Sequence, residues 1–185
     1  MPSYTPPLRD MQFVIHELLV AVDELKQIPA YGDVDADTVN AVLEEAGKFA
    51  TGVLSPINGS GDHEGARWQD SSVTMPEGFM AAYRQFVENG WNGIGCEPEY
   101  GGQGMPKVVV AAVQEMWKAS NMAFSLCPLL TTGAIEAITL NGAPELKAAY
   151  LPKMIEGSWT GTMNLTEPQA GSDLALVRSR AVPQG

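Results

Sequence analysis

The sequence predicts a mainly α-helical protein whose last part changes to β-structure. Apolar residues recur every three or four positions through most of the chain, which is the period of an amphipathic helix. From Ser158 to Thr166 the period falls to two, which is typical of a strand. The 185 residues suffice for one domain and part of a second.

The composition excludes some functions. The 22 acidic and 11 basic residues give a net charge of −11, which argues against nucleic acid as a partner. No run of about 18 uncharged apolar residues occurs, so we expect no membrane span. The first residues lack the order of a secretory signal. Cys96 and Cys127 lie among apolar or small residues and are expected to be reduced core thiols of a cytoplasmic protein.

The first predicted helix begins near Thr5, ends near Pro29 and carries an apolar stripe. The stripe consists of Leu8, Met11, Ile15, Leu18, Val22 and Leu25. One helix cannot bury such a stripe, so it must pack within its own protein or bind a partner chain. Packing within the protein is favoured. Partner binding defines an alternative function, a non-catalytic helical module that uses the Leu8–Leu25 stripe.

Further helices are predicted up to residue 157. They cover about 37–54, 76–89, 107–120, 129–140 and 144–155, with Pro or Gly near their ends. Ser55-Pro56 is expected to end the first of these, because a residue before proline avoids the helical region. A polar loop should follow over 58–74. The predicted domains are therefore a helical extension (1–34), a helical bundle (35–157) and the start of a β-domain (158–185).

Two short stretches contain residue types that can bind a ligand. Asp62-His63-Glu64 could ligate a metal, but adjacent residues converge poorly on one ion, so we predict a solvated loop and no metal site. The glycine-rich stretch over 100–104 lacks both the G-x-G-x-x-G spacing and a Lys-Ser/Thr ending, which favours a tight connector over a phosphate loop. Neither His16 nor His63 has a nearby nucleophile, so hydrolase chemistry has no support.

The stretch Gly161–Leu174 is more informative. After the alternating run, Glu167-Pro168 turns the chain, and Ala170-Gly171-Ser172 offers small side chains. Small residues let a ligand approach backbone N–H groups, as at a pyrophosphate or a flavin edge. On local chemistry alone, a plain turn capped by Ser172 and Asp173 is favoured. A second short strand could run over 177–182.

A family resemblance changes that balance. The sequence LTEPQAGSDL resembles the flavin-binding signature of the acyl-CoA dehydrogenase family, with its T-E-P-x-A-G-S-D core, although Gln169 stands where many members have glycine. EPEYGGQGMP resembles the loop before that family's central helices. GAPELKAAYLPKMIEGSWTGTMNLTEP resembles its passage from the amino-terminal domain into the middle β-domain. The extra first helix is similar to the branch that includes 3-methylmercaptopropionyl-CoA dehydrogenase.

The resemblance implies α,β-dehydrogenation of an acyl-CoA thioester with FAD as the hydride acceptor and an electron-transferring flavoprotein as the partner. It assigns the FAD contacts to Met163, Leu165, Thr166, Gly171 and Ser172. It assigns acyl-CoA contacts to Ser172, Phe124 and Cys127. Core packing explains Phe124 and Cys127 equally well.

The resemblance also implies that the chain is a fragment. The family's catalytic glutamate and its second flavin-contacting segment would lie beyond Gly185, so no catalytic residue is assigned here. We expect this chain to be inactive alone and the complete protein to be a homo-oligomer. We also expect residues 158–185 to be poorly ordered in the isolated chain, because a strand without a sheet leaves its backbone groups unpaired.

Overall fold

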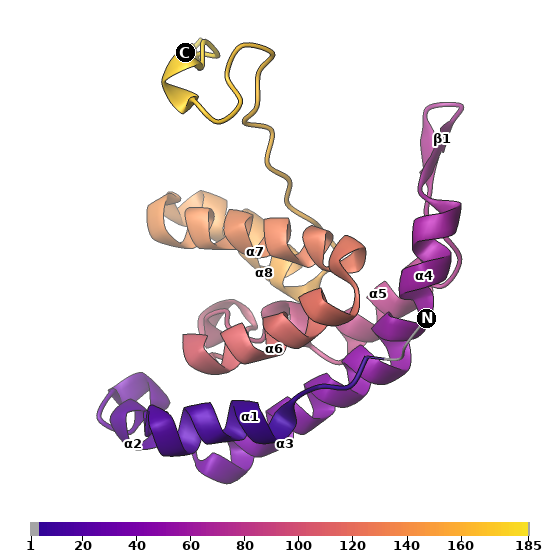
Figure 1. Ribbon diagram of the computed structural model, residues 1–185. Coiled ribbons are helices and arrows are strands. Elements are labelled where there is room, and N and C mark those ends of the chain that lie inside the picture. Colours follow the sequence, from indigo (N-terminus) through magenta and orange to yellow (C-terminus); the bar gives the residue numbers. More distant parts are fainter. Residues whose placement is uncertain (1–3, 185) are drawn as a thin grey trace.

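The computed structural model describes residues 4–184, which form a helical domain, a small hairpin and an irregular last segment (Figure 1). The main helices are α1 (Leu8–Gln12), α2 (Ala21–Leu25), α3 (Ala36–Phe49), α4 (Ser55–Glu64), α5 (Phe79–Glu88), α6 (Lys107–Ser120), α7 (Met122–Asn141) and α8 (Pro144–Glu156). The π-helices are η1 (Phe13–Leu18) and η3 (Ala50–Leu54). Short 3-10 turns are η2 (Pro29–Tyr31), η4 (Trp91–Gly93), η5 (Pro98–Tyr100) and η6 (Leu174–Leu176), and the strands are β1 (Arg67–Gln69) and β2 (Ser72–Thr74). In Figure 1, α1 and α3 lie on one side, α6 in the middle, and α7 with α8 on the other.

The predicted first helix is broken in two. The helix formed by α1 and η1 ends before Val20, whose φ of 48° lies in a region that β-branched residues rarely adopt. Helix α2 then starts in a new direction. Met11, Ile15 and Val22 are buried in the same core as Val39 of α3. The stripe therefore packs within the chain at these positions, as predicted, and the three buried residues are not available to a partner. Leu18 departs from the prediction, since it is 64% exposed.

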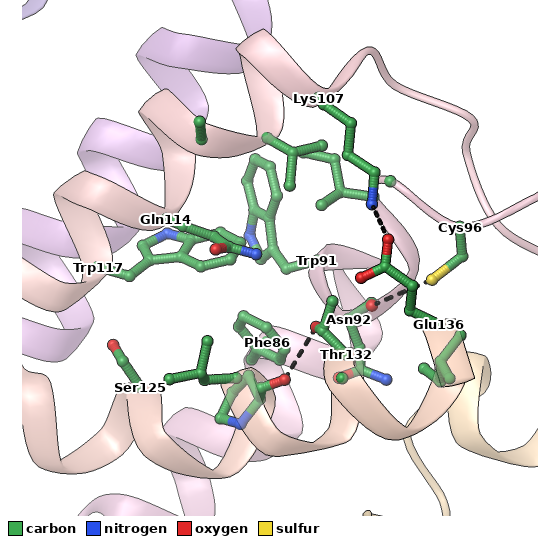
Figure 2. Close-up of a pocket in the computed structure, with 18 of the residues that line it drawn as sticks. Phe86, Trp91, Asn92, Cys96, Lys107, Gln114, Trp117, Ser125, Thr132 and Glu136 are labelled. Carbon is green, nitrogen blue, oxygen red and sulfur yellow. Dashed lines mark hydrogen bonds and ion pairs between the residues drawn. The ribbon is translucent and has the colours of Figure 1, made fainter. Parts of the chain in front are cut away.

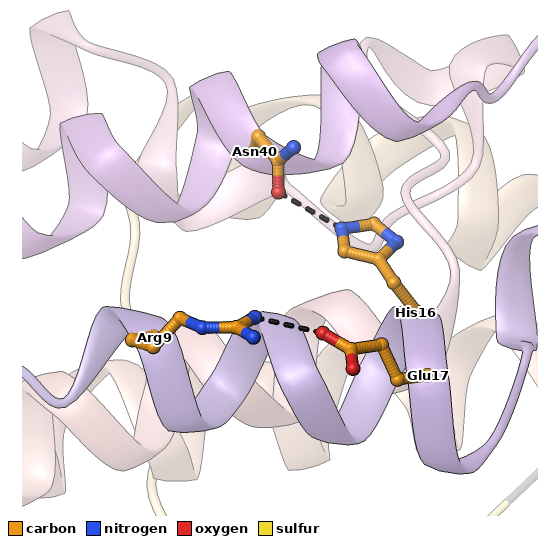
Figure 3. Close-up of polar contacts among 4 residues, drawn as sticks. All are labelled: Arg9, His16, Glu17 and Asn40. Carbon is orange, nitrogen blue, oxygen red and sulfur yellow. Dashed lines mark hydrogen bonds and ion pairs between the residues drawn. The ribbon is translucent and has the colours of Figure 1, made fainter.

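Polar contacts also fix this extension to the helical domain (Figure 3). His16 Nε2 lies 2.9 Å from Asn40 Oδ1 on α3, and the Arg9 guanidinium donates to Glu17 at 2.8 Å within the extension. A Cβ on Gly47 would lie 3.0 Å from Pro6 Cγ, so the glycine permits close packing. Residues 4–34 are thus part of one packed unit with α3.

The prediction that Ser55-Pro56 ends a helix is wrong. Helix α3 continues through the π-helix η3 into α4, which ends at Glu64. Proline has no N–H and clashes with the carbonyl four residues back in a regular α-helix. The wider π-turn precedes α4, so Pro56 falls in its first turn, where the missing N–H costs little.

The predicted loop over 58–74 is also wrong in part, because it contains the end of α4 and a hairpin. Strands β1 and β2 pair antiparallel, with Gln69 opposite Ser72. Asp70 and Ser71 connect them with φ values of 51° and 60°, as a two-residue type I′ turn requires. The hairpin projects away from the helices (Figure 1), and Trp68 on it is 74% exposed.

Helices α5 to α8 follow the prediction, except that α7 starts seven residues early relative to residue 129, at Met122. Asn121 caps it: its Oδ1 accepts from Phe124 N at 3.0 Å, and its Nδ2 donates to Leu54 O at 3.1 Å. Pro128 falls inside this helix. Helix α8 ends at Glu156, one residue beyond the predicted end near 155, and Gly157 caps it with a φ of 89° that suits glycine.

Among the described residues, α7 is the one helix long and apolar enough to cross a membrane, with 20 residues and a mean hydropathy of 1.5. The sequence prediction missed it because Glu136 interrupts the apolar run. Length and composition are weak evidence for a span, since core helices of soluble proteins pass the same test. Helix α7 contacts both α6 and α8.

The core is centred on aromatic side chains of α3, α5, α6 and α7. Phe86 is 1% exposed, and its ring centroid lies 5.0 Å from Trp117, 5.7 Å from Phe124 and 6.1 Å from Phe49. Each neighbour comes from a different helix. The contacts with Trp117 and Phe124 are edge to face, which adds to the stabilisation from burial alone.

The predicted strands after residue 157 do not form within residues 158–184. That segment leaves the helices (Figure 1) and holds one isolated bridge, between Glu167 and Ala170. Strand pairing needs a neighbouring strand, and the described chain supplies none for residues 158–184, which we call the ribbon. The predicted second strand over 177–182 is absent from it for the same reason.

We predict that Phe86→Ala destabilises the helical domain by about 3 to 5 kcal/mol, because it empties the centre of the aromatic core. Chemical denaturation followed by circular dichroism measures the change. Met80→Ala is the matched control, since Met80 lies on the same helix and is 56% exposed. Equal losses for the two variants would contradict this description of the core.

Candidate functional site

The T-E-P-Q-A-G-S-D stretch forms the predicted turn. Glu167 N donates to Ala170 O at 3.1 Å, and Ala170 N donates back to Glu167 O at 3.0 Å. Asp173 Oδ1 accepts from Ala175 N at 3.1 Å and caps η6. The predicted capping role is thus confirmed for Asp173. Gln169 has no positive φ, so this turn does not need glycine at that position.

The Glu167 carboxylate organises the residues that follow. It accepts from Arg178 N at 3.0 Å, from Ser179 N at 2.9 Å and from the Gln169 side chain. Hydrogen bonds from Ser179, then from Arg178, stabilise the charged form and lower the pKa of Glu167 from 4.5 to about 2. The segment over 167–179 is therefore a loop closed on one carboxylate.

The residues predicted to contact FAD are all accessible. Met163 is 65% exposed and Leu165 43% exposed, while Thr166, Gly171 and Ser172 also lie on the surface. Within residues 4–184, no hydrogen bond uses the backbone N–H of Met163, Leu165 or Thr166. A Cβ on Gly171 would meet open space. Free N–H donors, a hydroxyl and an unobstructed glycine are a donor set that fits a flavin and its phosphates.

The two residues predicted to contact the acyl group face different surroundings. Phe124 is 5% exposed and lines a cavity of about 660 Å³ between α6 and α7 (Figure 2). Cys127 is exposed and does not line it. None of the residues predicted to contact FAD lines this cavity. The structure therefore does not bring the two predicted sets together.

The cavity has an aromatic floor and a polar rim (Figure 2). Trp91 and Trp117 pack edge to face with centroids 5.4 Å apart, and the indole N–H of each is buried without a hydrogen-bond partner. At the rim, Lys107 Nζ lies 3.3 Å from Glu136 Oε1. Sequence analysis did not predict these four residues, because they come from separate helices and turns that only the fold brings together.

The glycine loop is a connector, as favoured. Gln103 N donates to Gly93 O, Gly104 N to Cys96 O and Met105 N to Ile94 O, at 2.8 to 2.9 Å. These bonds use the N–H groups that a phosphate would need. Gly102 is required by close packing, since its Cβ would lie 2.1 Å from Cys96 O.

The cysteine prediction is half correct. Neither thiol forms a disulfide, and Cys96 is partly buried, but Cys127 is exposed rather than in the core. Desolvation by neighbouring atoms raises the pKa of both thiols, so neither is a reactive thiolate at neutral pH. No cluster of three possible metal ligands occurs in the described part of the chain.

Comparison with known proteins places this geometry in a family. The model of the acyl-CoA dehydrogenase N-terminal domain matches residues 36–158. The chain belongs to the acyl-CoA dehydrogenase family. The match covers α3 to α8 and ends where the ribbon leaves the helices.

Individual acyl-CoA dehydrogenases agree. The chain is 47% identical over 182 residues to 3-methylmercaptopropionyl-CoA dehydrogenase of Ruegeria pomeroyi, covering 98% of this chain and 31% of that protein. It is 34% identical to a butyryl-CoA dehydrogenase of Syntrophomonas wolfei, covering 98% and 30%. Among solved structures, glutaryl-CoA dehydrogenase from Mycobacterium smegmatis shares the fold with a TM-score of 0.68 and 24% identity, over 89% of this chain and 39% of that one. The chain thus spans about 30% of the length of these curated relatives.

We predict that the Glu167 carboxyl titrates with a midpoint at about 2. A depressed pKa stabilises the hydrogen-bonded loop fully above the ordinary value of 4.5, and this contribution is lost as the pH falls toward 2. Carboxyl ¹³C chemical shifts measured against pH give the midpoint directly. A midpoint near 4.5 would show that the Arg178 and Ser179 amides do not bind this carboxylate.

Proposed function

We propose that this chain provides the amino-terminal helical domain and the first flavin-contacting segment of an FAD-dependent acyl-CoA dehydrogenase. The observation that carries the proposal is the 47% identity to 3-methylmercaptopropionyl-CoA dehydrogenase across 98% of the chain. That coverage includes the T-E-P-Q-A-G-S-D turn as well as the helices. The same relative supports a substrate of the acyl-CoA thioester class.

Different residues of the ribbon are proposed to contact different parts of FAD. The free N–H groups of Met163 and Leu165 and the Thr166 hydroxyl suit the polar edge of a flavin ring. Gly171 lets the chain approach the pyrophosphate, and the Ser172 hydroxyl can donate to a phosphate or to acyl-CoA. When bound, FAD accepts a hydride from the substrate.

The proposed reaction removes a proton from the α-carbon and a hydride from the β-carbon of the acyl thioester. We assign the role of the base that accepts this proton to no glutamate of this chain. Glu167, which is next to the FAD-contacting residues, is held as a carboxylate by the Arg178 and Ser179 amides, so its role is to shape the loop. Phe124 and Cys127 stay as proposed acyl contacts.

The exposed face of α7 supports a larger assembly. Met122, Leu126 and Leu140 on this helix are 53%, 49% and 73% exposed. Large apolar side chains exposed along a helix gain free energy when another surface covers them. We propose that further parts of the dehydrogenase cover it, either from the same polypeptide or from another subunit of a homo-oligomer.

The remaining parts of the proposal concern context. An electron-transferring flavoprotein is proposed to reoxidise the flavin. A cytoplasmic location is also proposed.

We predict that the protein from the complete reading frame purifies with a flavin absorbance spectrum, and that an acyl-CoA bleaches it. Catalytic turnover with an artificial dye acceptor is the second measurement. The 185-residue chain alone should show no turnover, because it lacks an assigned base. Anaerobic titration with butyryl-CoA, glutaryl-CoA and 3-methylmercaptopropionyl-CoA identifies the preferred acyl group.

Two results would overturn the proposal. A folded, colourless complete protein that does not take up FAD would remove the cofactor assignment and favour the alternative of an interaction module. Turnover by the 185-residue chain would show that the catalytic base lies among its own residues.

A further inference from the structure

Gly161 is the last residue that a hydrogen bond ties to the helices. Its N–H donates to Thr131 Oγ1 on α7 at 3.2 Å. From residue 162 to 184, every described hydrogen bond stays within the segment itself. Met163, the first residue proposed to contact FAD, comes two positions after this contact.

Thr131 is built to accept this bond. Thr131 is 1% exposed, and its hydroxyl donates to Cys127 O at 2.9 Å. A hydroxyl has one proton and two lone pairs, so donation to Cys127 O leaves an acceptor for Gly161 N–H. Because Thr131 is buried and Gly161 is partly buried, leaving either group unpaired would cost free energy.

Gly161 is selected by the same contact. A Cβ at this position would lie 2.5 Å from Ala134 Cβ and 3.3 Å from Thr131 Cα. No real side chain tolerates the first distance, and both neighbours belong to the rigid helix α7. The backbone of residue 161 therefore lies directly on α7, and any larger residue must lift it away.

The residues just before Gly161 are also fixed. Tyr83 donates its hydroxyl to Gly157 O at 3.0 Å, and Trp159 N donates to Lys153 O at 3.1 Å. Lys153 Nζ lies 4.3 Å from the centre of the Trp159 ring. Residues 157–161 are thus held to α5, α7 and α8.

We propose that Thr131 is a positioning residue that sets where the FAD-contacting segment 163–166 starts relative to the helical domain. We call the Thr131–Gly161 hydrogen bond the clamp. The inference rests on the proposed function, since it assigns the clamp a role in flavin binding. Gly161 is the last described point at which a hydrogen bond attaches the ribbon to the helices. Loss of the clamp would therefore displace residues 163–166 together.

The test uses the complete protein and the variant Thr131→Val, which keeps the shape and removes the hydroxyl. The matched control is Thr132→Val, because Thr132 makes the same helix bond, to Pro128 O at 2.9 Å, but does not contact Gly161. Thr131→Ser restores the hydroxyl. We expect Thr131→Val to bind FAD about tenfold more weakly and to expose residues 159–163 to hydrogen exchange. Thr132→Val and Thr131→Ser should stay close to the parent protein in both measurements.

Kinetics at saturating FAD separate positioning from stability. A misplaced flavin lowers kcat per bound flavin, whereas a merely destabilised protein loses folded enzyme without changing that ratio. If Thr131→Val does not fold, Gly161→Ala tests the same contact, and adding Ala134→Gly should restore part of the FAD binding by removing the 2.5 Å overlap.

The outcomes separate the two proposals. Unchanged exchange, unchanged FAD affinity and unchanged kcat in Thr131→Val would overturn the clamp. A parent protein that lacks FAD altogether would instead overturn the proposed function, and the exchange experiment would still report whether Thr131 holds Gly161.

Discussion

Asn121 connects the two halves of the helical domain, and the position of α7 depends on it. Its side chain accepts from Phe124 N at the start of α7 and donates to Leu54 O at the end of η3. Because Asn121 is 1% exposed, water cannot replace these partners, and each lost bond would leave a buried polar group. This one amide therefore fixes α7 to the long α3–η3–α4 helix. From α7 the same constraint passes to Phe124 in the aromatic core and to Thr131 beneath the ribbon.

Sequence patterns predicted the helices well wherever burial is one-sided. The apolar face of α3 and the start of η3 repeats Val39, Leu43, Ala46 and Ala50, all of which are 0% exposed. Such a face follows directly from helical periodicity. Patterns failed where tertiary contacts decide the backbone. Pro56 normally ends a helix, but a π-turn carries the chain past it. Asp70-Ser71 is a weak hairpin signal, since both residues take the left-handed conformation at some cost.

The candidate site shows the same division. The Glu167–Ala170 turn and the Asp173 cap were predictable because they depend on residues a few positions apart. The alternation over 158–166 predicted a strand that does not form within residues 4–184, because pairing is a property of two segments and the described residues supply no partner strand. The cavity between α6 and α7 could not be predicted, since Trp91, Trp117 and Lys107 are brought together only by packing.

Helix α7 and the ribbon after Gly161 each present unsatisfied groups, and one explanation can account for both. The exposed side chains of Leu126 and Leu129 would gain free energy from being covered. The ribbon after Gly161 presents unpaired N–H groups that would gain from a neighbouring strand or a bound acceptor. Helix α7 holds the start of the ribbon, and the ribbon has N–H groups free for pairing. Together they could form one side of a flavin site between domains. In that assembly the Thr131–Gly161 contact transmits the position of the packed helices to the groups that would hold the cofactor.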